Sequence, residues 1–439
     1  MTPPAAESST TQQTPSSRTA PPLSSPSSSP RARSAFSGPP HSLQVLAVWA
    51  AASALTFVIL RLGAQDTPTT PWAGAAPSWE EHMRFWDAGW YHRIVEEGYP
   101  DRLPVDANGR VTQNAWAFMP LLPALAGGIV RATGWSFYAC AALVATAASA
   151  GAAVVMDRWL APVVGERASL WAVALMWSSP CALVLQVPYA ESLGLLFTAA
   201  ALALAGRGGR GRFALAAACV VLAAFSRPIG VPLTLALAAW WLWELAGERP
   251  PGARGRWRGG ILPAASGPSG PDRGRQVRLL ALTILSGACT LAWPVLAWLS
   301  TGRGDAYTAT ETAWRDGSLT PFAPWLARSG WWVGPHLGPL LLAGILVVAA
   351  AALSAPSLRR LGPGAWFWCI AYVVYLLAFF DPTTSVFRIL LPLAPVAWAL
   401  AASLSLRRRI LLLTTCVVGQ LFWIGWVWDL SVRVTQWVP

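Results

Sequence analysis

Apolar runs of about 20 residues recur from 43–62 to 410–428, and they limit the possible fold more than any other feature. Each run is long enough for a helix to cross the hydrocarbon core of a bilayer, which is roughly 30 Å thick. Hydrophobic residues make up 54% of the 439-residue chain and charged residues only 12%. This composition excludes an ordinary soluble domain. The sequence therefore predicts an all-α, multi-pass integral membrane protein.

Residues 1–40 differ from the rest because they are mostly Ser, Thr, Pro and Ala. A segment with so few large apolar groups cannot bury enough surface to offset its ordering entropy, so we predict that it is disordered. The apolar run at 43–62 is longer than the core of a signal peptide, which indicates a retained first helix. Arginines before it favour a cytoplasmic tail: Arg18, Arg31 and Arg33. Residues 41–439 then form one transmembrane domain.

Charges in the loops predict the orientation of the helices. The loop at 63–115 holds eight of the twenty acidic residues and only four arginines, and we expect it to be a large first extracytoplasmic loop. The loop at 247–278 carries seven arginines and is expected in the cytoplasm, like the turns at 359–360 and 407–409. The net charge of +12 therefore follows the positive-inside pattern and does not indicate a nucleic-acid-binding surface.

The number of crossings follows from the same orientation. Six apolar runs lie between the outer 63–115 loop and the inner 247–278 loop, and an even number of crossings cannot change sides. The run at 116–131 is short and broken by Pro120 and Pro123, so we predict that it does not cross, leaving about eleven transmembrane helices. The loops at 300–332 and 381–385 are expected outside. Five polar clusters then share the outer face, around Asp87, Asn114, Glu191, Arg227 and Arg388.

One polar stretch on that face is typical of a reactive site: Phe85-Trp86-Asp87-Ala88-Gly89-Trp90-Tyr91-His92-Arg93-Ile94. A carboxylate among aromatic side chains is costly to bury without partners. The alternative is that Asp87 only caps a loop helix. His92, five residues on, would point away from Asp87 on a helix, and a structural role for it stays open. No acidic and histidine spacing resembles a zinc site, and there is no Gly-rich phosphate loop.

Three further charged residues stand at helix ends on the outer face. Glu191 follows Tyr189 at the start of an apolar run, where an ionisable group normally faces a partner or a watery cavity. Arg227 and Arg388 break the positive-inside pattern, and a guanidinium in such a position suits bidentate binding of a phosphate. The alternative for each arginine is an ion pair with a structural acid, Glu191 or Asp381.

Six segments in order resemble a known family. Phe85-Trp86-Asp87-Ala88, Ile94-Val95-Glu96-Glu97-Gly98-Tyr99 and Ala117-Phe118-Met119-Pro120 resemble the first luminal region of PIG-V-type mannosyltransferases, which include GPI mannosyltransferase II and bacterial relatives. The segments at 179–193, 226–230 and 387–392 resemble later motifs of that family. The likeness covers most of 41–405. Met119 stands where the family has an aromatic residue, Ile229 where it often has Asn, and the insert at 250–275 is not shared.

The resemblance implies a GT-C type helical bundle that acts as an inverting mannosyltransferase at the outer face of the cell membrane. The donor would be polyprenyl-phosphate mannose and the acceptor a glycolipid or lipoglycan, with no cofactor; whether a metal ion takes part stays open. Asp87 would be the general base, because an inverting transfer needs one carboxylate to take the acceptor proton. The other residues predicted to bind substrate are Trp86, Tyr91, His92, Tyr189, Glu191, Arg227 and Arg388.

Two other classes remain open from the residues. A protein O-mannosyltransferase or another GT-C transferase would share the same arrangement. A transporter or flippase of lipid-linked sugars would also have many helices, but it would typically show internal repeats and charges near the bilayer midplane. The sequence shows no repeat, and its charges gather at one face.

Overall fold

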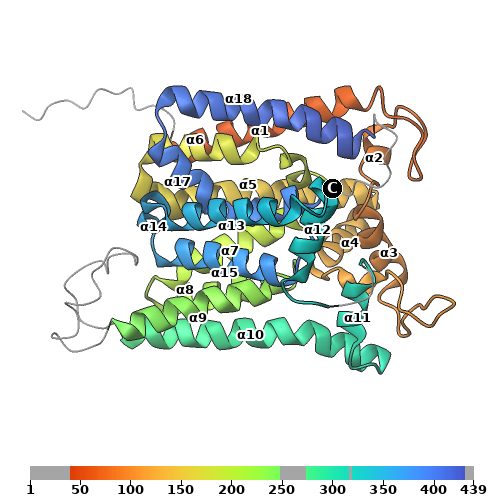
Figure 1. Cartoon of the computed structure of the whole chain (residues 1–439). Coiled ribbons are helices and arrows are strands. Elements are labelled where there is room, and N and C mark those ends of the chain that lie inside the picture. The colour runs from red at the N-terminus through yellow and green to blue at the C-terminus, as the bar shows by residue number, and fades with distance from the viewer. Residues whose placement is uncertain (1–39, 248–272, 316–318, 431–439) are drawn as a thin grey trace, which may run out of the picture. The chain divides into compact units, whose positions relative to one another are not determined.

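The computed structural model describes residues 40–247, 273–315 and 319–430, and within them the chain is almost entirely helical (Figure 1). The only extended pairing there is an isolated bridge between Val105 and Val111. This confirms the predicted all-helical, multi-pass membrane type of fold. The tail at 1–39 lies outside the described residues, as does most of the Arg-rich loop. Its last arginines belong to a helix that begins at Arg273, so the loop ends earlier than predicted.

The first half of the chain forms helices α1 to α9 and two short 3-10 turns. Their bounds are α1 His41–Gly63, α2 Trp79–His82, α3 Ala88–Glu97, η1 Ala115–Ala117, α4 Leu121–Thr133, α5 Phe137–Val164, α6 Glu166–Trp177, η2 Ala182–Leu185, α7 Glu191–Ala205, α8 Arg210–Ala224 and α9 Gly230–Ala246. Local sequence sets several starts. Ser136 accepts a hydrogen bond from the backbone N–H of Ala139 at the start of α5, and Ser78 and Glu81 form a capping box at α2.

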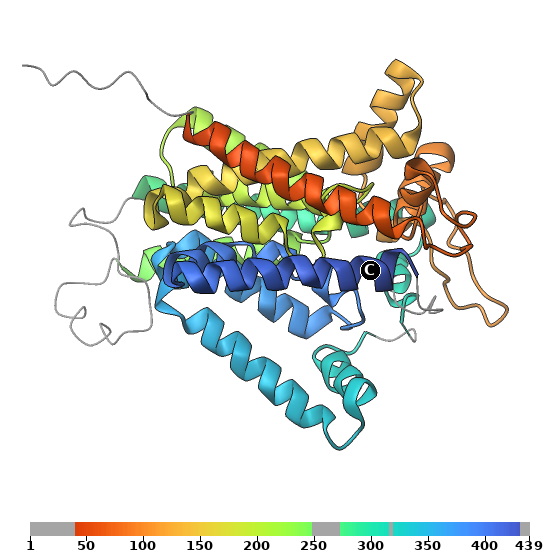
Figure 2. The same cartoon turned by 90° about the horizontal axis from the view of Figure 1, so that it is seen from above.

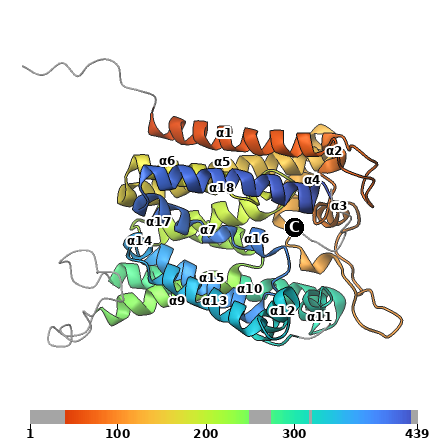
Figure 3. The ribbon, with the colours of Figure 1, turned by 45° about the horizontal axis from the view of Figure 1, so that its top comes forward.

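The second half begins with the 29-residue helix α10. The bounds are α10 Arg273–Thr301, α11 Ala306–Thr312, α12 Ala323–Val333, α13 Gly338–Ser354, α14 Pro356–Arg360, α15 Pro363–Phe379, α16 Val386–Ile389, η4 Leu391–Leu393, α17 Pro395–Ser403, α18 Leu406–Trp423 and the π-helical turn η5 Ile424–Trp428. In Figure 3, α16 lies between α18 and α15. Helices α2, α3, α11 and α12 gather at one end of the long helices in Figure 1, which we call the site end.

Within the described part of the chain, four helices are long and apolar enough to cross a membrane: α1, α5, α10 and α18 continued by η5. The number is up to six if each of two bent helix pairs counts as one span. The predicted count of about eleven would also need helices of 12 to 17 residues, and it stays a prediction. Helix α4 has 13 residues and is about 20 Å long. That 116–131 does not cross also stays a prediction.

Buried polar contacts join the long helices at the end opposite the site. Asp157 of α5 pairs with His41 of α1 at 2.9 Å and accepts a hydrogen bond from Ser169 of α6 at 2.6 Å. The indole N–H of Trp398 in α17 donates to the same Ser169 hydroxyl at 2.8 Å. Because a buried polar group is costly without partners, this chain of contacts fixes four helices against one another.

Candidate active site

Asp87 follows a backbone turn that an ordinary residue rarely adopts. Trp86 has a φ of 60°, in the left-handed region, and such strain often marks functional sites. Two contacts hold the turn: the indole N–H of Trp86 donates to the carbonyl of Val427 at 3.1 Å, and the backbone N–H of Asp87 donates to the Tyr189 hydroxyl at 3.3 Å. Asp87 occupies the N-cap position of α3, but its side chain makes no capping hydrogen bond. The capping alternative is therefore not what the structure shows.

The Asp87 carboxylate instead joins a cluster of four charges, which we call the ion quartet: Asp87, Glu191, Arg227 and Arg388. Nη1 of Arg388 lies 2.6 Å from Oδ2 of Asp87 and 3.0 Å from Oε1 of Glu191. The same Glu191 oxygen also pairs with Arg227. The Glu191 side chain is only 3% exposed, whereas that of Asp87 is 17% exposed. The quartet is neutral in sum, and Asp87 is its most accessible member.

Two atoms of the quartet have no hydrogen-bond partner among the residues that the structure describes. Nε of Arg388 and Oε2 of Glu191 are both buried and unpaired. One is a donor and the other, on an ionised carboxylate, is an acceptor. A ligand that offers one acceptor and one donor would satisfy both. Buried polar atoms without partners are uncommon in native structures, so this pair is consistent with a binding site.

The quartet assembles where helices begin or end. Glu191 is the first residue of α7, and Arg227 lies in the turn between α8 and α9. The side chain of Arg227 crosses α7 at Gly194, where an added Cβ would lie 3.3 Å from its Cδ. Arg388 belongs to the short helix α16, and its guanidinium lies over the Tyr189 ring at 5.1 Å. The chain turns at the site, so the helices next to these charges begin or end there.

The alternative that both arginines form ion pairs with structural acids holds for Glu191 but not for Asp381. Both arginines do pair with Glu191. Arg388 does not pair with Asp381, which instead forms a two-point ion pair with Arg328 of α12.

The end of the last helix supports the Asp87 turn, a contact that was not predicted. Trp428 is fully buried, donates to the carbonyl of His82 at 3.3 Å and packs against the Tyr189 ring at 5.6 Å. The neighbouring Asp429 carboxylate lies 3.3 Å from Nε2 of His82. Burial raises the pKa of Asp429, and the nearby His82 opposes that shift. An acidic residue at the end of the last apolar run was the one available signal.

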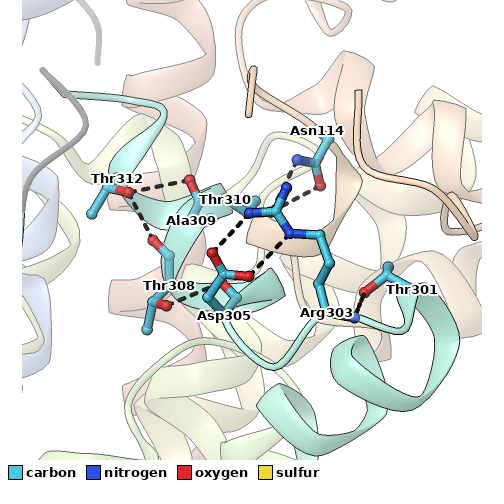
Figure 4. A network of polar contacts seen from close by, with 8 residues as sticks. All are labelled: Asn114, Thr301, Arg303, Asp305, Thr308, Ala309, Thr310 and Thr312. Atoms are coloured by element: carbon cyan, nitrogen blue, oxygen red, sulfur yellow. Dashed lines mark hydrogen bonds and ion pairs between the residues drawn. The ribbon is translucent and has the colours of Figure 1, made fainter. Parts of the chain in front are cut away.

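A second segment, the helix α11, contacts the first loop, although the two are far apart in the sequence. The Asn114 amide donates to the Thr310 hydroxyl at 2.9 Å, which fastens α11 to the start of η1 (Figure 4). The next residue, Glu311, is half-buried; burial raises its pKa, while the hydrogen bond from Tyr307 and the charges of two arginines, one of them Arg227, oppose the shift. Glu311 therefore lies within electrostatic reach of the ion quartet. Glu311 was not predicted, because nothing near it in the chain is unusual.

The remaining predicted residues divide between the site and its surroundings. Tyr91 is buried near the quartet, and its burial raises the pKa of the phenol. His92 faces elsewhere: its ring packs against Tyr138 at 4.9 Å, and Nε2 lies 3.3 Å from Glu96. The structural role for His92 is therefore the one supported, and its prediction as a substrate-binding residue is not. No group of three or more metal-ligating side chains occurs among the described residues.

No family model matches the chain, and no curated protein matches it. Among solved structures, it is similar to ArnT from Cupriavidus metallidurans bound to undecaprenyl phosphate, at 16% identity and a TM-score of 0.48, over 82% of this chain and 62% of that one. It is also similar to the Archaeoglobus fulgidus oligosaccharyltransferase in the apo form, at 15% identity and a TM-score of 0.46, over 88% of this chain and 56% of that one. The chain thus spans about three fifths of their length.

The complex of AglB from Archaeoglobus fulgidus with an inhibitory peptide and a dolichol-phosphate gives a comparable likeness, with 16% identity and a TM-score of 0.45 over 88% of this chain and 55% of that one. Similarity at this level assigns no residue of this chain a role. The candidate site rests on the geometry of the ion quartet.

Proposed function

We propose that the chain is an inverting GT-C type mannosyltransferase that uses a polyprenyl-phosphate mannose donor and a glycolipid or lipoglycan acceptor at the outer face of the cell membrane. The observation that carries the proposal is the ion quartet, in which one accessible carboxylate, Asp87, adjoins two arginines at the site end. The choice of mannose follows from the family resemblance of the motifs around Asp87, Glu191, Arg227 and Arg388.

The unpaired atoms of the quartet suit a glycosyl phosphate. Nε of Arg388 needs an acceptor, which a phosphate oxygen supplies, and Oε2 of Glu191 needs a donor, which a sugar hydroxyl supplies. A glycosyl phosphate carries both groups, the phosphate on the anomeric carbon and a hydroxyl on the next ring carbon. A neutral sugar could also reach both atoms through its hydroxyls, but a phosphate oxygen is the stronger, charge-assisted acceptor for a guanidinium.

The reaction can then be written with balanced atoms. The acceptor hydroxyl oxygen forms a bond to the anomeric carbon, and the bond from that carbon to the phosphate oxygen breaks on the opposite face. Asp87 takes the hydroxyl proton as general base. The electron pair leaves with the polyprenyl phosphate, whose low basicity removes the need for a second proton donor. Arg227 and Arg388 stabilise its negative charge.

Asp87→Asn tests this function. The amide keeps the shape of the side chain but cannot accept the proton, so transfer from polyprenyl-phosphate mannose in membranes should fall by roughly 10²–10⁴-fold. The variant should stay folded because Arg388 still forms its ion pair with Glu191, 3.0 Å away.

Two exposed acids of the same loop provide matched controls. Glu80 pairs only loosely with Arg84 at 3.6 Å, and Glu96 pairs with His92, so Glu80→Gln and Glu96→Gln should keep most of the activity. Near wild-type transfer by a well-expressed Asp87→Asn protein would refute the role of Asp87 and direct the search for the base to Glu191.

A further inference from the structure

Residues 376–382, which we call the approach segment, form the end of α15 and the start of the turn into α16, the short helix that carries Arg388. Side-chain and backbone donors from the region of α11 and α12 converge on the backbone of this segment. Four of its carbonyls accept a hydrogen bond: Phe379 from Arg315 at 2.7 Å, Leu376 from Trp325 at 2.8 Å, Ala378 from the backbone N–H of Phe322 at 3.0 Å, and Pro382 from Trp332 at 3.3 Å. Nothing in the proposed reaction has yet used these contacts.

An ion pair fastens the same segment through its one charged residue, Asp381. Arg328 of α12 donates to both carboxylate oxygens, from Nε to Oδ1 at 3.0 Å and from Nη2 to Oδ2. A two-point bond of this kind fixes the relative orientation of the two groups as well as their separation. The Arg328 guanidinium also lies over the ring of Trp331, 5.5 Å from its centroid. Arg328 is therefore itself held where it meets Asp381.

Stability gives no sufficient reason for this arrangement. The side chains of Arg328 and Asp381 are 28% and 18% exposed, and a partly exposed ion pair adds little to stability. Figure 2 shows α12 and α13 projecting from the remaining helices, so the contacts reach back from an arm to the approach segment. Phe322, just before α12, has a φ of 65°, which is unfavourable for a bulky residue. Such strain persists only where surrounding contacts impose it, and it often marks functional sites.

The turn between Asp381 and Arg388 is closed by its own hydrogen bonds. The backbone N–H of Thr383 donates to the carbonyl of Asp381 at 2.8 Å, and that of Val386 donates to the carbonyl of Thr383 at 3.0 Å. The hydroxyls of Thr383 and Ser385 are 2.8 Å apart and share a hydrogen bond. Because the turn is tied together in this way, a displacement of Asp381 is passed on to the start of α16, and so to the guanidinium of Arg388.

We propose that Arg328 is a positioning residue: through Asp381, it sets the direction in which Arg388 presents its guanidinium to the phosphate of the donor. The Tyr372 hydroxyl holds the end of α16 through the carbonyl of Ile389 at 2.7 Å, and the approach segment fixes its start. Arg328 touches no substrate in this role. Its effect is on geometry, to which charge-assisted bonds and transition states are sensitive. This inference rests on the proposed function.

Binding of undecaprenyl phosphate to the full-length protein in nanodiscs tests the positioning without sugar transfer. Arg328→Gln removes the charge and the fork, and it should raise the Kd roughly tenfold, because a misdirected Arg388 loses a charged hydrogen bond to the phosphate. Arg303→Gln is the matched control. Arg303 makes the same two-point bond to Asp305, at 3.0 and 2.8 Å, but at the start of α11 and away from the approach segment (Figure 4). It should leave the Kd unchanged.

A double-variant cycle shows whether Arg328 acts through Arg388. Arg328→Gln should add nothing to the loss in an Arg388→Lys protein, and Asp381→Asn should reproduce the effect of Arg328→Gln. In membranes, Arg328→Gln should raise the KM for polyprenyl-phosphate mannose and leave the KM for the acceptor unchanged. A rise in both KM values, or a lower Tm with an unchanged Kd, would reduce the pair to a structural one and overturn the proposal.

The remaining outcomes separate this inference from the proposed function. Wild-type binding by Arg328→Gln together with weakened binding by Arg388→Lys would refute the positioning alone. Additive losses in the double variant, or an equal loss in Arg303→Gln, would refute it as well. Wild-type binding by Arg388→Lys would refute the phosphate role of Arg388, and both the proposed function and this inference would then fall. A wrong choice of mannose would leave the binding results as they are, since undecaprenyl phosphate carries no sugar.

Discussion

Glu191→Gln removes the central charge of the ion quartet while keeping its size. In the wild type, two carboxylates balance two guanidiniums, and Oε1 of Glu191 pairs with both arginines. The glutamine leaves a net charge of +1 at a position that is 3% exposed. Removing one partner of a buried ion pair costs about 3–5 kcal/mol, because the other charge stays buried without compensation. Arg388 keeps its ion pair with Asp87 at 2.6 Å, so the loss falls mainly on Arg227. We therefore expect the free energy of unfolding to fall by about 3 kcal/mol.

Thermal unfolding of the detergent-solubilised protein measures this loss. A destabilisation of that size should lower the Tm by roughly 5 °C or more in a protein larger than 200 residues. Asp87→Asn is the matched control, since it removes the same charge from the same cluster but leaves both arginines paired with Glu191. A Glu191→Gln protein as stable as the wild type, or one more stable than Asp87→Asn, would show that Glu191 does not hold the arginines.

Three further predictions follow from the same contacts. Arg388→Lys should lower transfer by roughly 10- to 100-fold, the value of one hydrogen bond to a charged group, because an ammonium cannot reproduce the planar fork of donors; full activity would reduce Arg388 to a structural partner. Burial raises the pKa of Asp429 above its ordinary value of 3.8, so its stabilising effect is present below that value and is lost as the pH rises through the raised pKa. Asp429→Asn stays uncharged, and its Tm minus that of the wild type should therefore increase from about pH 4 to about pH 7; a constant difference would contradict the shift. In intact cells an impermeant thiol reagent should label Asp106→Cys and not Arg408→Cys, and the reverse result would invert the proposed orientation.

The apolar runs were sufficient to predict the helical membrane fold, because length and hydropathy are local properties. Charge patterns also placed Asp87, Glu191, Arg227 and Arg388 on a common face, and the structure brings these four side chains into contact. Each of them stands at a helix end, where breaks in the apolar pattern are visible in the sequence. Their grouping could be predicted for that reason.

The pairings themselves could not be predicted from the sequence. Arg388 contacts Asp87 across about 300 residues, and only the tertiary fold decides that Arg388 and not Arg328 reaches the site. The support from Trp428 has the same origin, since it depends on where the last helix ends relative to the first loop.

Stability alone does not account for the ion quartet. Replacing a buried ion pair with apolar side chains of similar volume is often neutral or stabilising, because taking charges out of water costs several kcal/mol per ion. A chain that only needed to join α7, α9 and α16 could use the leucines and alanines that fill the rest of its interior. The quartet instead leaves one buried donor on Arg388 and one buried acceptor on Glu191 unpaired, with the Asp87 carboxylate as its most exposed member. A ligand that supplies both an acceptor and a donor, as a glycosyl phosphate does, would satisfy both atoms at once.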